Sequence, residues 1–203
     1  GDFHGKYDRY RKIFSEVDHS IALGDMGIGF VNKVTNQYRR NPPYDEMVKC
    51  NARFIRGNHD NPGVCKRHSQ YIPDGHLYQD KIFCIGGAYS IDYMYRTEQY
   101  DWWPDEELSH QELTDIVDAY ENIRPSVVFS HEIPESLCKV LLNRDGFHMR
   151  EIPSRTRSAM QSMLDIHQPD LWVHGHWHFS HTTEHQGTKF IGLDELEYLD
   201  LDL

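Results

Sequence analysis

The stretch Gly175-His176-Trp177-His178 places two imidazoles beside a glycine, and it closes a series of similar segments. Each segment sets metal-binding side chains next to a Gly or Ser, where the backbone can turn sharply and approach a bound group. The earlier segments are Gly1-Asp2-Phe3-His4-Gly5, Gly24-Asp25-Met26-Gly27, Gly57-Asn58-His59-Asp60 and Ser130-His131. Together they supply Asp2, His4, Asp25, Asn58, His131, His176 and His178. Oxygen and imidazole donors without sulfur indicate divalent ions such as manganese, iron, nickel or zinc, and this set suffices for two ions.

Short apolar runs end directly at four of these segments. They are residues 20–23 before Gly24, residues 54–55 before Arg56-Gly57, residues 127–129 before Ser130, and residues 171–173 before His174. Such runs are typical of buried parallel strands, and ligands of α/β sheets bind beyond the carboxyl ends of the strands. We therefore expect the donors to meet at one edge of the β-structure.

Apolar periodicity predicts amphipathic helices over residues 6–17 and 105–123, and Ser154 is positioned to cap a third. Residues 81–85 and a hairpin around Gln186-Gly187 are expected to add strands of a second sheet. No internal repeat or linker interrupts the pattern. The expectation is one α/β domain over residues 1–203.

In this order the segments resemble the calcineurin-like metallophosphoesterases, whose pattern runs D-x-H, G-D, G-N-H-D/E, H and G-H-x-H. The resemblance extends from the first residue to about Asp194. It implies a four-layer α/β/β/α sandwich with two mixed sheets, and an apolar strand preceding Gly1. It also implies that Asp25 bridges two ions. The first ion would be held by Asp2, His4, Asp25 and His178, and the second by Asp25, Asn58, His131 and His176.

The resemblance implies hydrolysis of a phosphate ester by a hydroxide that bridges two divalent ions, with Mn²⁺ favoured. His59 would be the general acid for the leaving group, since an imidazole pKa of about 6.5 suits proton transfer at neutral pH. Asp60 would hydrogen-bond the other ring nitrogen of His59. The alternative for Asp60 is a purely structural role as a cap of its loop.

A departure from the family pattern bears on the substrate. Protein Ser/Thr phosphatases continue the second motif as G-D-x-V-D-R-G, whose Arg grips the phosphate, whereas residues 24–30 here read GDMGIGF. Because a diester carries one negative charge fewer, we expect a small phosphodiester, such as a cyclic nucleotide. The alternatives are a phosphomonoesterase resembling the Ser/Thr phosphatases and a non-catalytic binding scaffold. The complete ligand set disfavours the scaffold.

A second distinctive block, residues 86–107, resembles a segment of small bacterial and phage metallophosphoesterases. Its adjacent tryptophans are expected either to stack on a base or to anchor the following helix in the core. Arg56 either reaches the substrate or braces its loop. The candidate substrate contacts are Arg56, Tyr89, Arg96, Trp102, Trp103 and Arg155, with Arg157 as an alternative to Arg155.

Composition narrows the classes of partner. The 203 residues carry a formal net charge of −11, and dispersed basic residues disfavour a long nucleic acid as the substrate. The pair Arg39-Arg40 is interpreted as a solvated face. No apolar run approaches the roughly 18 residues of a membrane span. Four scattered cysteines without a C-x-x-C pair favour reduced thiols in a cytoplasmic protein.

Overall fold

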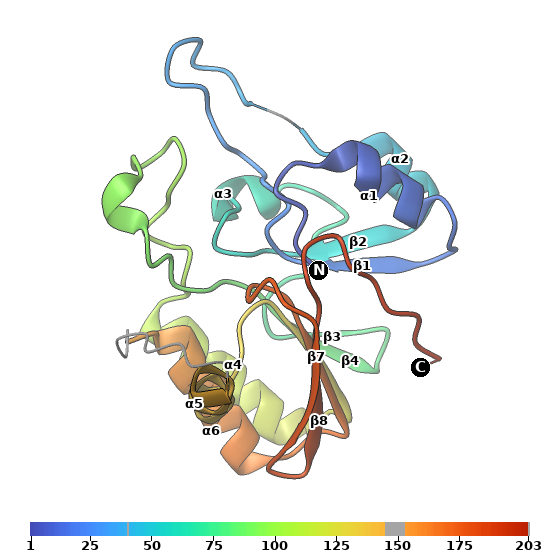
Figure 1. The fold of residues 1–203 in the computed structure, drawn as a ribbon, viewed down its shortest axis with the longest axis vertical. Coiled ribbons are helices and arrows are strands. Elements are labelled where there is room, and N and C mark those ends of the chain that lie inside the picture. Colours follow the sequence, from blue (N-terminus) through green and yellow to red (C-terminus); the bar gives the residue numbers. More distant parts are fainter. Residues whose placement is uncertain (40, 145–152, 203) are drawn as a thin grey trace.

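A computed structural model describes residues 1–39, 41–144 and 153–202 of the chain (Figure 1). The described strands form two sheets. In the smaller sheet, β1 (Ser20–Leu23) runs parallel to β2 (Ala52–Ile55). The larger sheet has the order β3-β4-β5-β6-β8-β7, with β3 (His76–Tyr78), β4 (Ile82–Ile85), β5 (Val127–Ser130), β6 (Leu171–His174), β7 (His181–His185) and β8 (Thr188–Gly192). The edge strands β3 and β7 are antiparallel to their neighbours, so the larger sheet is mixed, as expected. The smaller sheet differs from the expectation of two mixed sheets, since its two described strands are parallel.

The register of the parallel strands brings the predicted segments to one edge. In the larger sheet, Ile85, Ser130 and His174 are direct neighbours at the carboxyl ends of β4, β5 and β6. In the smaller sheet, Leu23 pairs with Ile55 immediately before the second and third segments. The loops that leave these strands therefore emerge together, which confirms the expectation drawn from the apolar runs.

Helices cover the two sheets separately. Helices α1 (Tyr7–Phe14), α2 (Tyr44–Lys49) and α3 (Pro62–Cys65) contribute to one hydrophobic cluster with β1 and β2. Helices α4 (His110–Ile123), α5 (Glu135–Arg144) and α6 (Arg155–Ile166) pack with the larger sheet around Trp172 and Phe190, and lie together on one side of it in Figure 1. A third cluster combines Leu23 and Ile55 of the smaller sheet with side chains of the larger one.

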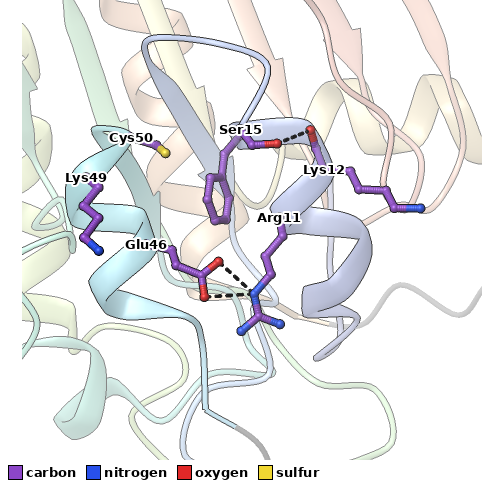
Figure 2. Close-up of a pocket in the computed structure, with 7 residues that line it drawn as sticks. Arg11, Lys12, Ser15, Glu46, Lys49 and Cys50 are labelled. Carbon is purple, nitrogen blue, oxygen red and sulfur yellow. Dashed lines mark hydrogen bonds and ion pairs between the residues drawn. The ribbon is translucent and has the colours of Figure 1, made fainter.

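A surface contact connects the first two helices. Arg11 of α1 donates from Nε to both carboxylate oxygens of Glu46 on α2, at 3.2 and 3.0 Å (Figure 2). A shallow pocket beside this pair is lined by residues of α1 and α2 and by Cys50. None of the predicted site residues belongs to that pocket, so it has no part in the chemistry below.

Capping and turn residues predicted the start of α6 and the hairpin correctly, but the start of the long helix was predicted wrongly. Ser154 caps α6 as expected, with Oγ accepting from the Arg157 amide, and the hairpin turns at Gln186. The long helix begins at His110 rather than at residue 105, because Ser109 and Glu112 form a capping box there. Glu106 and Glu107 turn inward instead of starting the helix, and both are buried. No helix of the described residues is long and apolar enough to cross a membrane.

Candidate metal centre

The predicted ligands converge into two overlapping groups. Asp25 is common to both and is 1% exposed. Within each group the potential ligand atoms all lie within 4.8 Å of one another. One group is Asp2, His4, Asp25 and His178, and the other is Asp25, His131 and His176. Asn58 adjoins the second group, since its Oδ1 lies 3.0 Å from His131 Nε2. The grouping matches the assignment implied by the resemblance.

The first group is tightly packed. His178 Nε2 lies 2.8 Å from Asp2 Oδ2 and 3.0 Å from His4 Nε2. His4 Nε2 lies 3.9 Å from Asp25 Oδ2. In the second group, His131 Nε2 lies 3.3 Å from Asp25 Oδ1, while its Nδ1 contacts the Leu23 carbonyl oxygen at 2.7 Å. The Leu23 contact leaves Nε2 of His131 facing Asp25 and Asn58.

The electrostatics of the centre favour a bound cation. Asp2 and Asp25 are buried, and their recorded ionic neighbours in the described chain are histidines rather than Lys or Arg. Burial opposes a charged imidazole, yet Asp25 and Asp2 outweigh it and raise the pKa of His131 to about 10. A divalent ion bound there would replace this imidazolium as the partner of the two buried carboxylates and would hold His131 in its deprotonated, ligating form. The donors therefore fit divalent ions.

Glycines leave the space that the centre occupies. A Cβ on Gly24 would collide with the His131 ring, one on Gly57 with Asp25, and one on Gly175 with Asp2 Oδ1. Each of these glycines lies one or two residues after the end of a strand, where a donor side chain from another segment packs against it. Steric crowding therefore explains the glycines that precede Asp25, Asn58 and His176 in the sequence.

Several donors hold an unusual backbone conformation. His4, Asp25, His176 and His178 have φ values of 45°, 47°, 68° and 51°. Left-handed backbone is sterically costly for residues with a Cβ, and it tends to persist where surrounding structure enforces it. Four donors hold this conformation, which indicates that the loops are constrained to direct these side chains toward the centre rather than to adopt the backbone of lowest local energy.

His59 lies at the rim of the centre. Its backbone N–H donates to Asp25 Oδ1 at 2.8 Å, and its ring Nε2 lies 3.3 Å from Arg96 Nη2. Burial lowers the pKa of His59 to about 4; Arg96 adds to this effect and Asp25 opposes it. The ring is thus neutral at pH 7 in the protein alone. Because a guanidinium only donates, the Arg96 contact places the ring hydrogen on Nδ1.

Asp60 occupies a different place from the one expected for a partner of the His59 ring. Its carboxylate accepts from the amides of Gly57, Ile28 and Met26 at 2.8, 2.9 and 3.1 Å. It joins the second and third segments, which favours the structural alternative for this residue. Burial, with a further contribution from Asp25, raises its pKa to about 6.

The six candidate substrate contacts divide into two kinds. Arg56 is buried, pairs with Asp74 at 2.9 Å and donates to the Glu106 carbonyl, so it braces its loop. Arg155 donates to the carbonyls of Leu108 and Glu107. Trp103 is 2% exposed and packs edge-on against Phe30, and Trp102 lies beside Tyr93. Only Tyr89 and Arg96 of the six are among the described residues that line the clefts beside the centre.

The larger cleft has a volume of about 760 Å³. Asn58, His59, His176 and His178 form its polar end. Its remaining wall is largely apolar and aromatic, and is formed by Tyr89, Ile91, Leu141, Leu142, Trp177 and Phe179. Ser90, Asp92 and Arg157 complete the lining. Of these residues, Tyr89 was predicted from the sequence as a substrate contact and Arg157 as the alternative to Arg155. The smaller cleft, about 330 Å³, lies on the side of His4 and His59 and is lined further by Gly5, Gly27, Phe30, Arg39 and Arg96.

Two buried carboxylates that sequence reasoning missed support the donors. Asn58 Nδ2 donates to Ser90 Oγ at 2.9 Å, and Ser90 donates to Glu106 at 2.6 Å, which turns Asn58 Oδ1 toward His131. Glu132 accepts from Arg157 Nε at 3.1 Å and from Trp177 Nε1 at 2.9 Å, and lies 3.7 Å from His176 Nε2.

The sequence offered one signal for such support. Glu132 is a charged residue directly after a donor, and it lies between the end of an apolar run at Phe129 and the apolar Ile133. Burial of an unpaired carboxylate is unfavourable, so a charge in that position requires a partner elsewhere in the fold. The partner, Arg157, is remote in sequence, which is why only the structure identifies the pair.

Comparison with known proteins agrees with this geometry. A search of curated proteins finds no match. The sequence model of the calcineurin-like phosphoesterases matches residues 1–180, which span all five donor segments. The chain belongs to the calcineurin-like, metal-dependent phosphoesterase family.

Proposed function

We propose that the protein is a dinuclear-metal phosphoesterase acting on a small phosphodiester that carries a ring system, such as a nucleotide. One observation supports this most directly: the complete donor set around Asp25 opens onto a cleft with an aromatic and apolar wall. The volume of about 760 Å³ falls within the range of small-molecule sites. The proposal includes stacking of the two sheets as the inner layers of an α/β/β/α sandwich, which the shared cluster around Leu23 and Ile55 supports.

In this proposal the two donor groups hold one divalent ion each, with Asp25 shared and Asn58 added to the second. When bound, such ions supply Lewis acidity and a water activated at neutral pH. Oxygen and imidazole donors accommodate Mn²⁺, which is the first ion to test. Ser90 and Glu106 fix the Asn58 amide, and Glu132 and Arg157 fix the loop that bears His176.

His59 is the proposed proton donor to the leaving oxygen. Its ring lies beside Asp25 at the junction of both clefts, where the ester must sit. A phosphate anion near the ring favours its charged form and raises the pKa of His59 from the value near 4. Arg96 shares Nε2 of the ring in the protein alone, and the substrate would take over that contact.

Arg96 also supports a second candidate, a phosphomonoesterase. The second motif lacks the usual Arg, but Arg96 brings a guanidinium to 3.3 Å from His59 from a different loop. A guanidinium there stabilises the extra charge of a monoester. The choice of a diester therefore rests on the ring-binding wall of the cleft rather than on the missing Arg.

The test is a hydrolysis panel with Mn²⁺, comparing 4-nitrophenyl phosphate, its bis-ester and cyclic nucleotides. We expect the diesters to be turned over faster, and Asp25→Asn to abolish turnover of all of them. His59→Ala should reduce turnover of esters with poor leaving groups by about 10²–10⁴-fold and affect nitrophenyl esters less. The exposed His110→Ala is the matched control. Faster turnover of monoesters or phosphopeptides would overturn the substrate proposal and leave the metal assignment standing.

A further inference from the structure

The smaller cleft differs from the larger one in charge. It lies beyond His4 and His59, and its wall contains two guanidinium groups, those of Arg39 and Arg96. The larger cleft, which also borders His59, is mainly apolar, and the Arg157 in its lining is paired with Glu132. A substrate whose reacting phosphoryl group sits at the donors can therefore extend past His59 into two clefts of different character.

The two arginines are held in different ways. Arg96 is fixed: Nε and Nη2 each donate to Asp92 at 2.7 Å, and Nη1 donates to the Asp101 carbonyl oxygen at 3.3 Å. Arg39 is exposed, and within the described ranges its side chain has no recorded hydrogen bond or ion pair. One charge of the cleft is thus partly neutralised by Asp92, and the other is available to a ligand.

The loop that presents Arg39 is tied to the loop that presents Arg96. The Arg39 amide donates to the Phe30 carbonyl oxygen at 2.7 Å, and residues 31–38 close into a turn through the Val31–Tyr38 bridge. Lys33 of this turn donates to Thr97 at 2.6 Å and pairs with Asp101 at 3.5 Å. These contacts place both arginines on one cleft. The Asp101 carboxylate is paired with Lys33 in the same set of contacts.

We propose that this cleft is a second anion subsite, in which Arg39 and Arg96 bind a phosphate of the substrate other than the one that is hydrolysed. The inference rests on the proposed function and makes it more specific: the substrate has a ring system on one side of the scissile ester and a second phosphate on the other. Guanidinium groups bind phosphate through paired, charge-assisted hydrogen bonds. The open space of about 330 Å³ accommodates such a group.

The experiment compares two chromogenic diesters: thymidine 5′-(4-nitrophenyl phosphate) and the same compound carrying a 3′-phosphate. In both, the nitrophenyl ring represents the ring system on one side of the scissile ester, and the 3′-phosphate lies on the other side. With Mn²⁺-loaded protein, the 3′-phosphate should raise kcat/KM by about 10–100-fold, as expected for hydrogen bonds to a charged group. Arg39→Ala should remove most of that ratio and Arg39→Lys should retain part of it. The exposed Arg9→Ala, on α1 and outside the cleft, should leave the ratio unchanged.

A second measurement separates this subsite from the catalytic proposal. Thymidine 3′,5′-bisphosphate is titrated calorimetrically into the metal-loaded protein and into Arg39→Ala. We expect the variant to bind it at least 10-fold more weakly. If neither diester is hydrolysed but this difference persists, the proposed reaction fails and the subsite stands. Equal binding by both proteins, or a 3′-phosphate effect that survives Arg39→Ala, overturns the subsite.

Discussion

Substitution of Gly175 by Ala is expected to displace one donor, Asp2, while leaving the rest of the fold intact. Gly175 does not require a left-handed backbone, so alanine fits its conformation. Its Cβ, however, would lie far inside van der Waals contact of Asp2 Oδ1, and that oxygen must retreat by roughly 1 Å. The carboxylate would then lose its contacts with the His176 amide, at 3.1 Å, and with His178 Nε2, at 2.8 Å.

The size of the effect follows from that displacement. Metal–ligand distances tolerate changes of about 0.2 Å, so a shift of roughly 1 Å should lower the affinity for the first ion by about 100-fold or more. The metal-free protein should lose only about 1–2 kcal/mol, since one or two hydrogen bonds are disturbed. Calorimetric titration of metal-stripped protein with Mn²⁺ measures the first effect, and urea denaturation measures the second.

Gly63→Ala is the matched control, because the nearest atom to its added Cβ is Asn61 Oδ1 at an ordinary 3.4 Å. It should bind both ions as the unchanged protein does. If Gly175→Ala binds two ions with undiminished affinity, then Asp2 is not a donor whose position matters. A loss of stability much larger than a few kcal/mol would instead point to collapse of the loop rather than displacement of the carboxylate.

Three further predictions concern buried carboxylates. Glu132→Gln should lower the affinity for the second ion by about 10–100-fold and leave the affinity for the first unchanged. Glu107 is a buried carboxylate that caps α6, and Glu107→Gln should leave both affinities unchanged in the same titration. Asp60→Asn should lower the free energy of unfolding by about 1–3 kcal/mol in urea, because an amide cannot replace all three acceptor contacts; lost turnover with unchanged stability would restore a role toward His59. Burial raises the pKa of Glu106 to about 7, so its protonated form stabilises the fold below the unfolded pKa of about 4.5, and that contribution is lost as pH rises through 7. Stability should therefore fall between pH 5 and 8 more steeply than in Glu106→Gln, and equal slopes would show that Glu106 is not the titrating group.

The donors of four segments were predictable from the sequence because a short apolar strand comes directly before each of these segments. Parallel strands deliver their carboxyl-terminal loops to one edge, so His131 and His176 could be placed together without knowing the helices. The position of a residue after a strand does not show in which direction its side chain points, so roles that depend on this direction were not predictable from the sequence. Asp60 follows His59 in sequence, yet its partners include the amides of Met26 and Ile28 in another loop.

The same limit explains why the sequence left two roles open for residues on the substrate side. Trp103 and Arg56 belong to conspicuous motifs, but the core offers them buried positions against Phe30 and Asp74. The aromatic wall of the larger cleft comes instead from Tyr89, Trp177 and Phe179, two of which lie inside or beside the last donor segment. Periodicity reports which face of an element is apolar, but it does not report which cleft a loop residue borders.

The left-handed backbone at His4, Asp25, His176 and His178 has an evolutionary consequence. Each such residue costs roughly 1–2 kcal/mol that a glycine would not. In a lineage released from selection for hydrolysis, substitution of these residues by glycine would therefore raise the stability of the metal-free fold and weaken metal binding.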